Sequence, residues 1–118
     1  MTETTTDLQV EATKKMALQA LEALKADNIV LLNVSGIASF TDYMIFASGN
    51  SRRHVGAIAD SVIAAAKSAG RPAQGVEGEE VGEWILVDLG DAIVHIMLPE
   101  VRQYYELEKL WGEELAAG

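Results

Sequence analysis

The sequence contains no cysteine and, among its 118 residues, only two prolines and two histidines. Without cysteine the chain can form neither a disulfide nor a thiolate metal site. A membrane-spanning helix needs about 20 consecutive apolar residues, and here Asp, Asn, Ser or Gly interrupts every apolar run well before that. The first residues also lack the basic and apolar regions of a secretory signal. We therefore expect a soluble cytoplasmic protein without a metal or other cofactor.

Positive charge is also scarce, because 9 Lys and Arg residues stand against 18 Asp and Glu residues, for a net charge of -9. An acidic surface repels phosphates, so a partner bound mainly through nucleic acid is disfavoured. A basic protein is the more natural partner. The acidic residues cluster in two segments, 77–83 and 100–114. Each segment is either a solvated surface or a contact for such a partner.

The length and the hydrophobic fraction of 49% suffice for one core, so we expect a single domain over residues 7–118 after a flexible segment, 1–6. Apolar periodicity predicts a helix at 7–25, a strand at 28–34 buried on both faces, a strand at 42–49, a helix at 51–70 capped by Ser51, a short extended piece at 73–78, two further strands and a helix at 100–114. The strand at 42–49 is apolar on both faces, so helices must cover both sides of the sheet. This pattern predicts an α/β domain with a mixed sheet of about five strands.

The two later strands are joined at Gly90-Asp91, a dipeptide that favours a two-residue hairpin turn. With that turn, Leu86 lies opposite His95 in the expected register. One face of the hairpin then carries Trp84, Leu86, Asp88, Ile93, His95 and Met97.

The final helix is expected to begin after Pro99, which suits a first helical turn. Its apolar side chains span an arc of roughly 220°, about twice what a helix covering a sheet needs. They are Val101, Tyr104, Tyr105, Leu107, Leu110 and Trp111. Either this helix is deeply buried, or part of its aromatic side faces another molecule. That molecule could be a second copy of this chain in a homodimer.

The stretch SGNSRRHV at 48–55 resembles the end of a strand, a turn and the first turn of a helix, as in loops that bind phosphate. It holds a single glycine and lacks the GK[ST] ending of a phosphate loop. Nucleotidyltransferases follow such a turn with two carboxylates one residue apart on a strand, whereas Asp88 and Asp91 are three apart across a tight turn. A nucleotidyltransferase-like metal-dependent enzyme therefore stays an alternative, and we expect the protein not to be an enzyme.

The charged and imidazole side chains give no stronger chemical signal. Asp42, His54 and His95 could be imagined around a metal ion, but neither an HExxH nor a His-x-His spacing is present. Arg52 and Arg53 fall in the first turn of the expected second helix, where a cation opposes the helix dipole. Since helix stability does not explain them, they are either solvated or paired with an acidic group on this chain or on a partner.

Two segments, 39–60 and 77–111, match the motifs of a known family in order and spacing. The motifs are an Asp-Tyr strand, a Gly-x-Ser turn followed by His, an EG…W-x-L-x-D-x-G hairpin, a Val-His strand and a terminal Arg-x-Tyr-Tyr-x-Leu-Glu-x-Leu-Trp. Through them the chain resembles the ribosomal silencing factors, also called the Iojap family. The resemblance covers nearly the whole chain beyond Thr6.

The resemblance implies a fold distantly akin to nucleotidyltransferases but without their catalytic carboxylates. It implies a translational repressor that binds the large ribosomal subunit through its basic ribosomal protein uL fourteen, with rRNA only at the periphery. Bound there, the protein would sterically block the small subunit when nutrients run short, without a catalytic step. A role in large-subunit assembly is the other alternative, and a homodimer off the ribosome is compatible with the resemblance.

The contact residues that we expect divide into anchors and polar contacts. The anchors are Trp84, Tyr104, Tyr105 and Leu107. The polar contacts are Asp42, Ser51, Arg53, His54, Asp88, His95 and Glu108. Tyr43 and Trp111 are expected in the core instead.

Overall fold

The computed structural model describes residues 5–106 and 109, with side chains for 7–103, 106 and 109. In chain order the elements are α1 (Thr5–Ala23), β1 (Asp27–Asn33), β2 (Tyr43–Ser48), α2 (Arg52–Ser68), β3 (Gly75–Glu77), β4 (Trp84–Asp88), β5 (Ala92–Met97) and α3 (Pro99–Tyr105). This order follows the predicted alternation of helices and strands. No helix in this part of the chain is long and apolar enough to cross a bilayer.

The five strands form one sheet in the order β1-β2-β5-β4-β3. Strands β2 and β5 are parallel and the other neighbours are antiparallel, so the predicted mixed five-stranded sheet is confirmed. The hairpin register is also confirmed, because Leu86 lies opposite His95 and the Leu89 N–H donates to the Ala92 carbonyl at 2.9 Å. Trp84 lies opposite Met97, at the end of β5 from which α3 begins.

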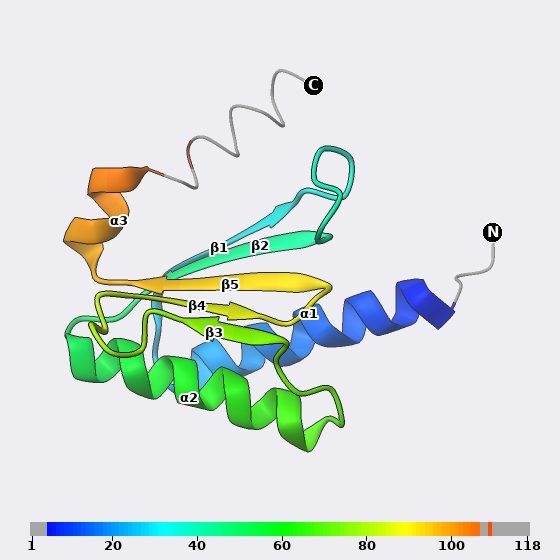
Figure 1. Ribbon diagram of the computed structural model, residues 1–118, viewed down its shortest axis with the longest axis horizontal. Helices are drawn as coiled ribbons and strands as arrows, with labels where there is room; N and C mark the ends of the chain where they lie inside the picture. The colour runs from blue at the N-terminus through cyan, green and yellow to red at the C-terminus, as the bar shows by residue number, and fades with distance from the viewer. Residues whose placement is uncertain (1–4, 107–108, 110–118) are drawn as a thin grey trace.

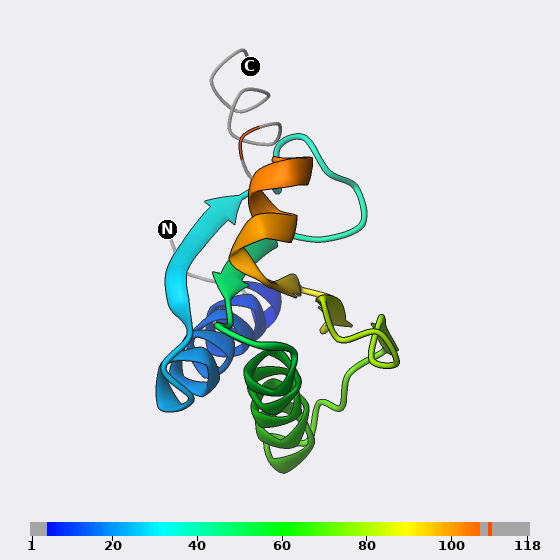
Figure 2. The same ribbon diagram turned by 90° about the vertical axis from the view of Figure 1, so that its left-hand side faces the viewer.

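Helices cover both faces of the sheet, as predicted (Figure 1). The helices α1 and α2 pack side by side on one face, while α3 lies over one end of the other face (Figure 2). The larger core lies under α1 and α2, where Ile45, Ile58 and Val94 are fully buried. The smaller core, on the face of α3, is built around Phe46 and Met97. The central strands β2 and β5 are buried along their whole length because they contribute to both cores.

Helix α2 begins as its sequence predicts. The Ser51 Oγ accepts a hydrogen bond from the His54 N–H at 3.0 Å, which satisfies one of the free donors of the first turn. Gly49 just before it has a packing reason, because a Cβ there would lie 2.8 Å from the backbone nitrogen of Val55. The turn can therefore approach the helix only without a side chain at position 49.

Two predictions about the elements are wrong. Strand β1 was expected to be buried on both faces, but it is the edge strand of the sheet, and Leu31 is 36% exposed. A run of apolar residues does not reveal whether a strand has a neighbour on each side. The final helix was expected to reach residue 114, but α3 ends at Tyr105 because Glu106 takes a left-handed conformation with φ of 50°. The expected helix is therefore interrupted at Glu106; residue 109 is again helical, and the rest of that segment is not described.

Two aromatic residues, Tyr43 and Trp111, were expected in the core. Tyr43 is 8% exposed and belongs to the core under α1, as predicted. Trp111 lies outside the described residues.

Candidate functional site

Three rings from three neighbouring strands meet on the sheet face that α3 partly covers. Phe46 on β2 and His95 on β5 are register partners, and their rings stack with centroids 5.0 Å apart and an interplanar angle of 11°. The Trp84 ring on β4 follows, 5.9 Å from the His95 ring and tilted by 43°. Phe46 is fully buried, His95 is 5% exposed and Trp84 is half-buried. The rings thus lead from the core to the surface.

A hydrogen bond joins the outer two rings. The Trp84 Nε1–H donates to the His95 Nδ1 at 3.1 Å. Since Nδ1 accepts, the ring proton of the neutral imidazole is on Nε2. Burial lowers the pKa of His95 to about 4, so the imidazole is neutral at physiological pH. We expected His95 to contact a partner directly, but the structure places it beneath Trp84, away from the surface.

Apolar side chains from β4 and from α3 accompany Trp84 on the smaller core, and we call them together the Trp84 surface. Leu86 and Val101 are half-buried and pack, like Trp84, against the smaller core. Tyr104 and Tyr105 form the last turn of α3, where only their backbone is described. Leu107 and Glu108 lie outside the described residues. The structure therefore brings Trp84 and α3 to the same end of the sheet.

A groove of about 630 Å³ lies beside α3, where the ends of β1 and β2 meet that helix. Its wall includes Ser48, Gln103 and Lys109, and also Arg102, whose Nη1 donates to the Ser48 Oγ at 2.9 Å. Arg102 is 8% exposed, and nothing in the sequence pattern had singled it out. By the strand order, α3 has Trp84 on one side and this groove on the other. The buried guanidinium of Arg102 thus holds α3 on the sheet.

His54 and Ser51, both expected as polar contacts, are already bonded within the fold. The His54 Nδ1 accepts from the Asn50 N–H at 2.9 Å, and its Nε2 lies 2.7 Å from the Leu24 carbonyl, to which it donates. The imidazole thereby ties the end of α1 to the start of α2. Ser51 is exposed, and its Oγ accepts from the His54 N–H, as described above.

The two arginines of α2 have different surroundings. Arg52 Nη2 is 2.5 Å from Glu83 Oε1, so this cation pairs with an acidic group of the same chain. Arg53 is exposed, and within the described ranges no carboxylate lies at ion-pair distance from it. Of the two, only Arg52 has an ion-pair partner among the described residues.

Asp42 and Asp88 are at the opposite end of the sheet from Trp84. The Asp88 Oδ1 accepts from the Gly90 N–H at 2.8 Å and shapes the hairpin turn. Asp42 is half-buried just before β2, and its backbone bonds to Val34 and Asp91. These two expected contacts are therefore not part of the Trp84 surface.

The same geometry bears on the enzyme alternative. The Gly-Asn-Ser turn follows Ser48, which pairs with Met97, whereas the candidate carboxylates Asp88 and Asp91 flank the other end of β5. Asp91 Oδ2 is bound by the Thr13 hydroxyl at 3.3 Å. Across the residues that the structure describes, no three His, Asp or Glu side chains come together as metal ligands would. The turn and the carboxylates do not form one site.

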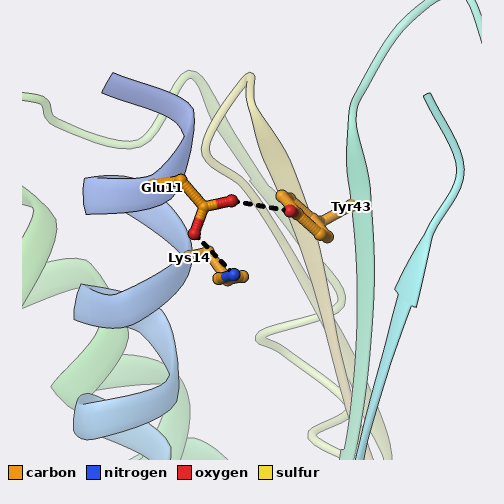
Figure 3. Close-up of polar contacts among 3 residues, drawn as sticks. All are labelled: Glu11, Lys14 and Tyr43. Carbon is orange, nitrogen blue, oxygen red and sulfur yellow. Dashed lines mark hydrogen bonds and ion pairs between the residues drawn. The ribbon is translucent and has the colours of Figure 1, made fainter. Parts of the chain in front are cut away.

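The sequence did not reveal a polar cluster that fixes α1 to β2. The Tyr43 hydroxyl donates to Glu11 Oε1 at 2.9 Å, and Lys14 Nζ is 2.6 Å from Glu11 Oε2 (Figure 3). Hydrogen bonds from Lys14 and Tyr43 lower the pKa of Glu11, while burial and the bond to Glu11 raise the pKa of Tyr43. The i, i+3 spacing of Glu11 and Lys14 can be read from the sequence. Tyr43, however, is 32 residues from Glu11, so its part in the cluster cannot. This cluster joins two elements of the fold and lies away from the Trp84 surface.

Comparisons with known proteins give one consistent assignment. The family model described as "Ribosomal silencing factor during starvation" matches residues 7–117. Ribosomal silencing factor RsfS of Chromobacterium violaceum is 47% identical over 105 residues, 89% of this chain and 86% of that protein. Mitochondrial assembly of ribosomal large subunit protein 1 of Mus musculus is 35% identical over 99 residues, 81% of this chain and 43% of that protein.

The solved structures agree with the sequence comparisons. A crystal structure of a Chromobacterium violaceum protein superposes with a TM-score of 0.85 at 48% identity, covering 87% of this chain and 86% of that one. The match of the family model over almost the whole chain, together with these identities, shows the family, as the motifs predicted. The chain belongs to the ribosomal silencing factor family, and its role is ribosome-associated.

Proposed function

We propose that the protein binds the large ribosomal subunit through its basic ribosomal protein uL fourteen and thereby blocks joining of the small subunit during starvation. The observation that carries this proposal is the half-buried Trp84, held at the surface by the buried His95 and Phe46 rings beside α3. Aromatic side chains fixed in this way are typical centres of protein interfaces. The family description and the name of the mouse relative support a large-subunit partner.

Charge and size are compatible with this partner. The net charge of -9 favours encounter with a basic ribosomal protein and disfavours a grip on rRNA, which stays at the periphery. An interface of roughly 1,600 Å² in total would hold the complex. Arg53, which has no ion-pair partner within the part of the chain that is described, would add a polar contact at its rim.

The proposed mechanism is steric and has no chemical step. A domain bound where the small subunit docks needs affinity and position, and no catalytic centre. The turn at Gly49–Ser51 and the carboxylates of the hairpin, at opposite ends of the sheet, give no support for phosphoryl transfer. We therefore propose a non-enzymatic repressor that acts in the cytoplasm, where the ribosomes are.

The test is co-sedimentation with purified bacterial large subunits, together with a subunit-joining assay. Trp84→Ala is expected to weaken binding by tenfold or more, since central aromatic anchors cost about 2 kcal/mol or more when truncated. Phe40→Ala is the matched control, because Phe40 is 59% exposed and lies in the loop before β2, away from Trp84. Wild-type protein that leaves subunit joining unchanged at saturation would contradict the repressor function.

A second candidate function is large-subunit assembly, which the name of the mouse relative favours. Loss of an assembly factor leaves precursor particles that lack late-joining proteins, whereas loss of a repressor leaves mature subunits that join too readily. Sedimentation profiles and the protein content of large subunits from cells without the gene would separate the two.

We also propose that the protein can form a homodimer off the ribosome. Such a dimer would appear as a solution mass that rises with protein concentration.

A further inference from the structure

His95 is an unexpected residue for its position in the smaller core. It lies on the buried strand β5, stacked on Phe46, with 5% of its surface exposed. Its Nε2 is buried and finds no hydrogen-bond acceptor among the described residues. A buried donor without an acceptor destabilises a fold, and an apolar side chain of similar shape would avoid this loss. Stability therefore does not explain why position 95 carries an imidazole.

The other ring nitrogen offers an explanation. The His95 Nδ1 accepts the Trp84 Nε1–H at 3.1 Å, and no phenylalanine or leucine could do so. The Phe46 ring fixes the plane of the imidazole, since the two rings are within 11° of parallel. The position of Nδ1 is thus set by the core before any partner arrives.

We propose that His95 is a positioning residue that holds the Trp84 indole in the orientation in which it binds its ribosomal partner. This inference rests on the proposed function, in which Trp84 is the anchor. Trp84 also packs against the smaller core, and losing this hydrogen bond would remove one restraint on its side-chain rotamer, which must be restored when the indole binds. With the bond, the indole is ordered in the free protein, so less entropy is lost in the complex.

The size of the effect follows from that lost freedom. Ordering one side chain at an interface costs roughly 0.5–1.5 kcal/mol, which corresponds to about a 2- to 12-fold change in affinity. Among mutants of one interface most of such a change is in the dissociation rate. His95 should therefore alter how long the protein stays on the large subunit.

The experiment compares a variant that keeps an acceptor for the Trp84 indole with one that removes it. His95→Asn places an amide oxygen near the position of Nδ1, whereas His95→Phe keeps a ring on Phe46 without an acceptor. Two quantities are measured: the dissociation rate from purified large subunits, and the hydrogen exchange of the Trp84 indole, assigned by its absence in Trp84→Phe. His95→Phe is expected to dissociate about 2- to 12-fold faster with faster indole exchange, and His95→Asn to recover both.

Other outcomes would overturn the inference in distinguishable ways. If Trp84→Ala weakens binding but His95→Phe dissociates like the wild type, Trp84 is an anchor and His95 does not position it. Faster dissociation of His95→Phe with unchanged indole exchange would assign the loss to another cause. If Trp84→Ala itself binds like the wild type, the anchor in the proposed function is wrong and the inference falls with it. His95→Leu replaces His95→Phe should the larger ring prevent folding, as thermal unfolding would reveal.

Discussion

Acid should destabilise this protein through His95 in a way that one substitution removes. Burial lowers the pKa of His95 to about 4 in the folded chain, against 6.5 for a free imidazole. Between these values the unfolded chain binds a proton that the folded chain does not. The free energy of unfolding must therefore fall as the pH falls from about 6.5, and the contribution of His95 to this loss is complete below about 4.

The magnitude follows from the difference of 2.5 pKa units, obtained as 6.5 minus 4. At 1.36 kcal/mol for each unit, the full loss is about 3 kcal/mol, of which roughly 2 kcal/mol is reached at pH 5. This is a large share of the roughly 5–15 kcal/mol by which small domains are stable. The loss should therefore be measurable at a pH where the protein is still folded.

The assay is urea unfolding, followed by circular dichroism, from pH 7.5 to pH 4.5 for the wild type and His95→Phe. Every other titratable group is the same in both proteins, so the contributions of these groups cancel in the difference between the two free energies. That difference should shift by about 2 kcal/mol in favour of His95→Phe on going from pH 7.5 to pH 5. Two parallel curves would refute the reasoning, since they would mean that the imidazole takes up its proton as readily in the folded chain as in the unfolded one.

Two further predictions concern the larger core and its polar cluster. Gly49→Ala should lower the free energy of unfolding by about 1–3 kcal/mol, because the new Cβ would lie 2.8 Å from atoms in the first turn of α2. Gly56→Ala is its control in thermal unfolding: no atom lies within 4 Å of a Cβ there, so helix propensity should raise the midpoint. Lys14→Met should raise the pKa of Glu11 more than Tyr43→Phe does, since Lys14 is the larger cause of its lowering. An NMR titration of the Glu11 carboxyl carbon checks this order, and the reverse order would contradict it.

The hairpin shows what the sequence could predict of the site. Gly90-Asp91 fixes a two-residue turn, and from it the pairing of Leu86 with His95 follows by counting. The same counting puts Trp84 and His95 on one face of the sheet. Local chemistry determined the register, so no knowledge of the rest of the fold was needed.

The relative burial of those two residues could not be predicted in this way. Whether a side chain on that face is covered depends on β2, which pairs with β5 from more than 40 residues earlier in the chain. Phe46 covers one side of the His95 ring, and Trp84 at the end of β4 stays half-buried. Strand order also decided the exposure of β1, whose apolar sequence would suit a central strand equally well.

The bonding partners of the polar residues could not be predicted for a related reason. His54 was expected among the polar contacts to a partner, and in the fold it bonds to the carbonyl of Leu24, 30 residues away. Asp42 and Asp88 belong to the end of the sheet away from Trp84, which only the assembled strands reveal. Arg53 alone among the expected charged contacts in the described ranges is exposed and without an ion-pair partner there.

The seven residues of α3 are too few for a helix that persists on its own. Its direction is therefore imposed by Pro99 at its start and by the Arg102 guanidinium on Ser48. The place of α3 therefore depends on the sheet beneath it more than on its own sequence. A change at Ser48, 54 residues before Arg102, would displace the whole helix and every side chain that it presents.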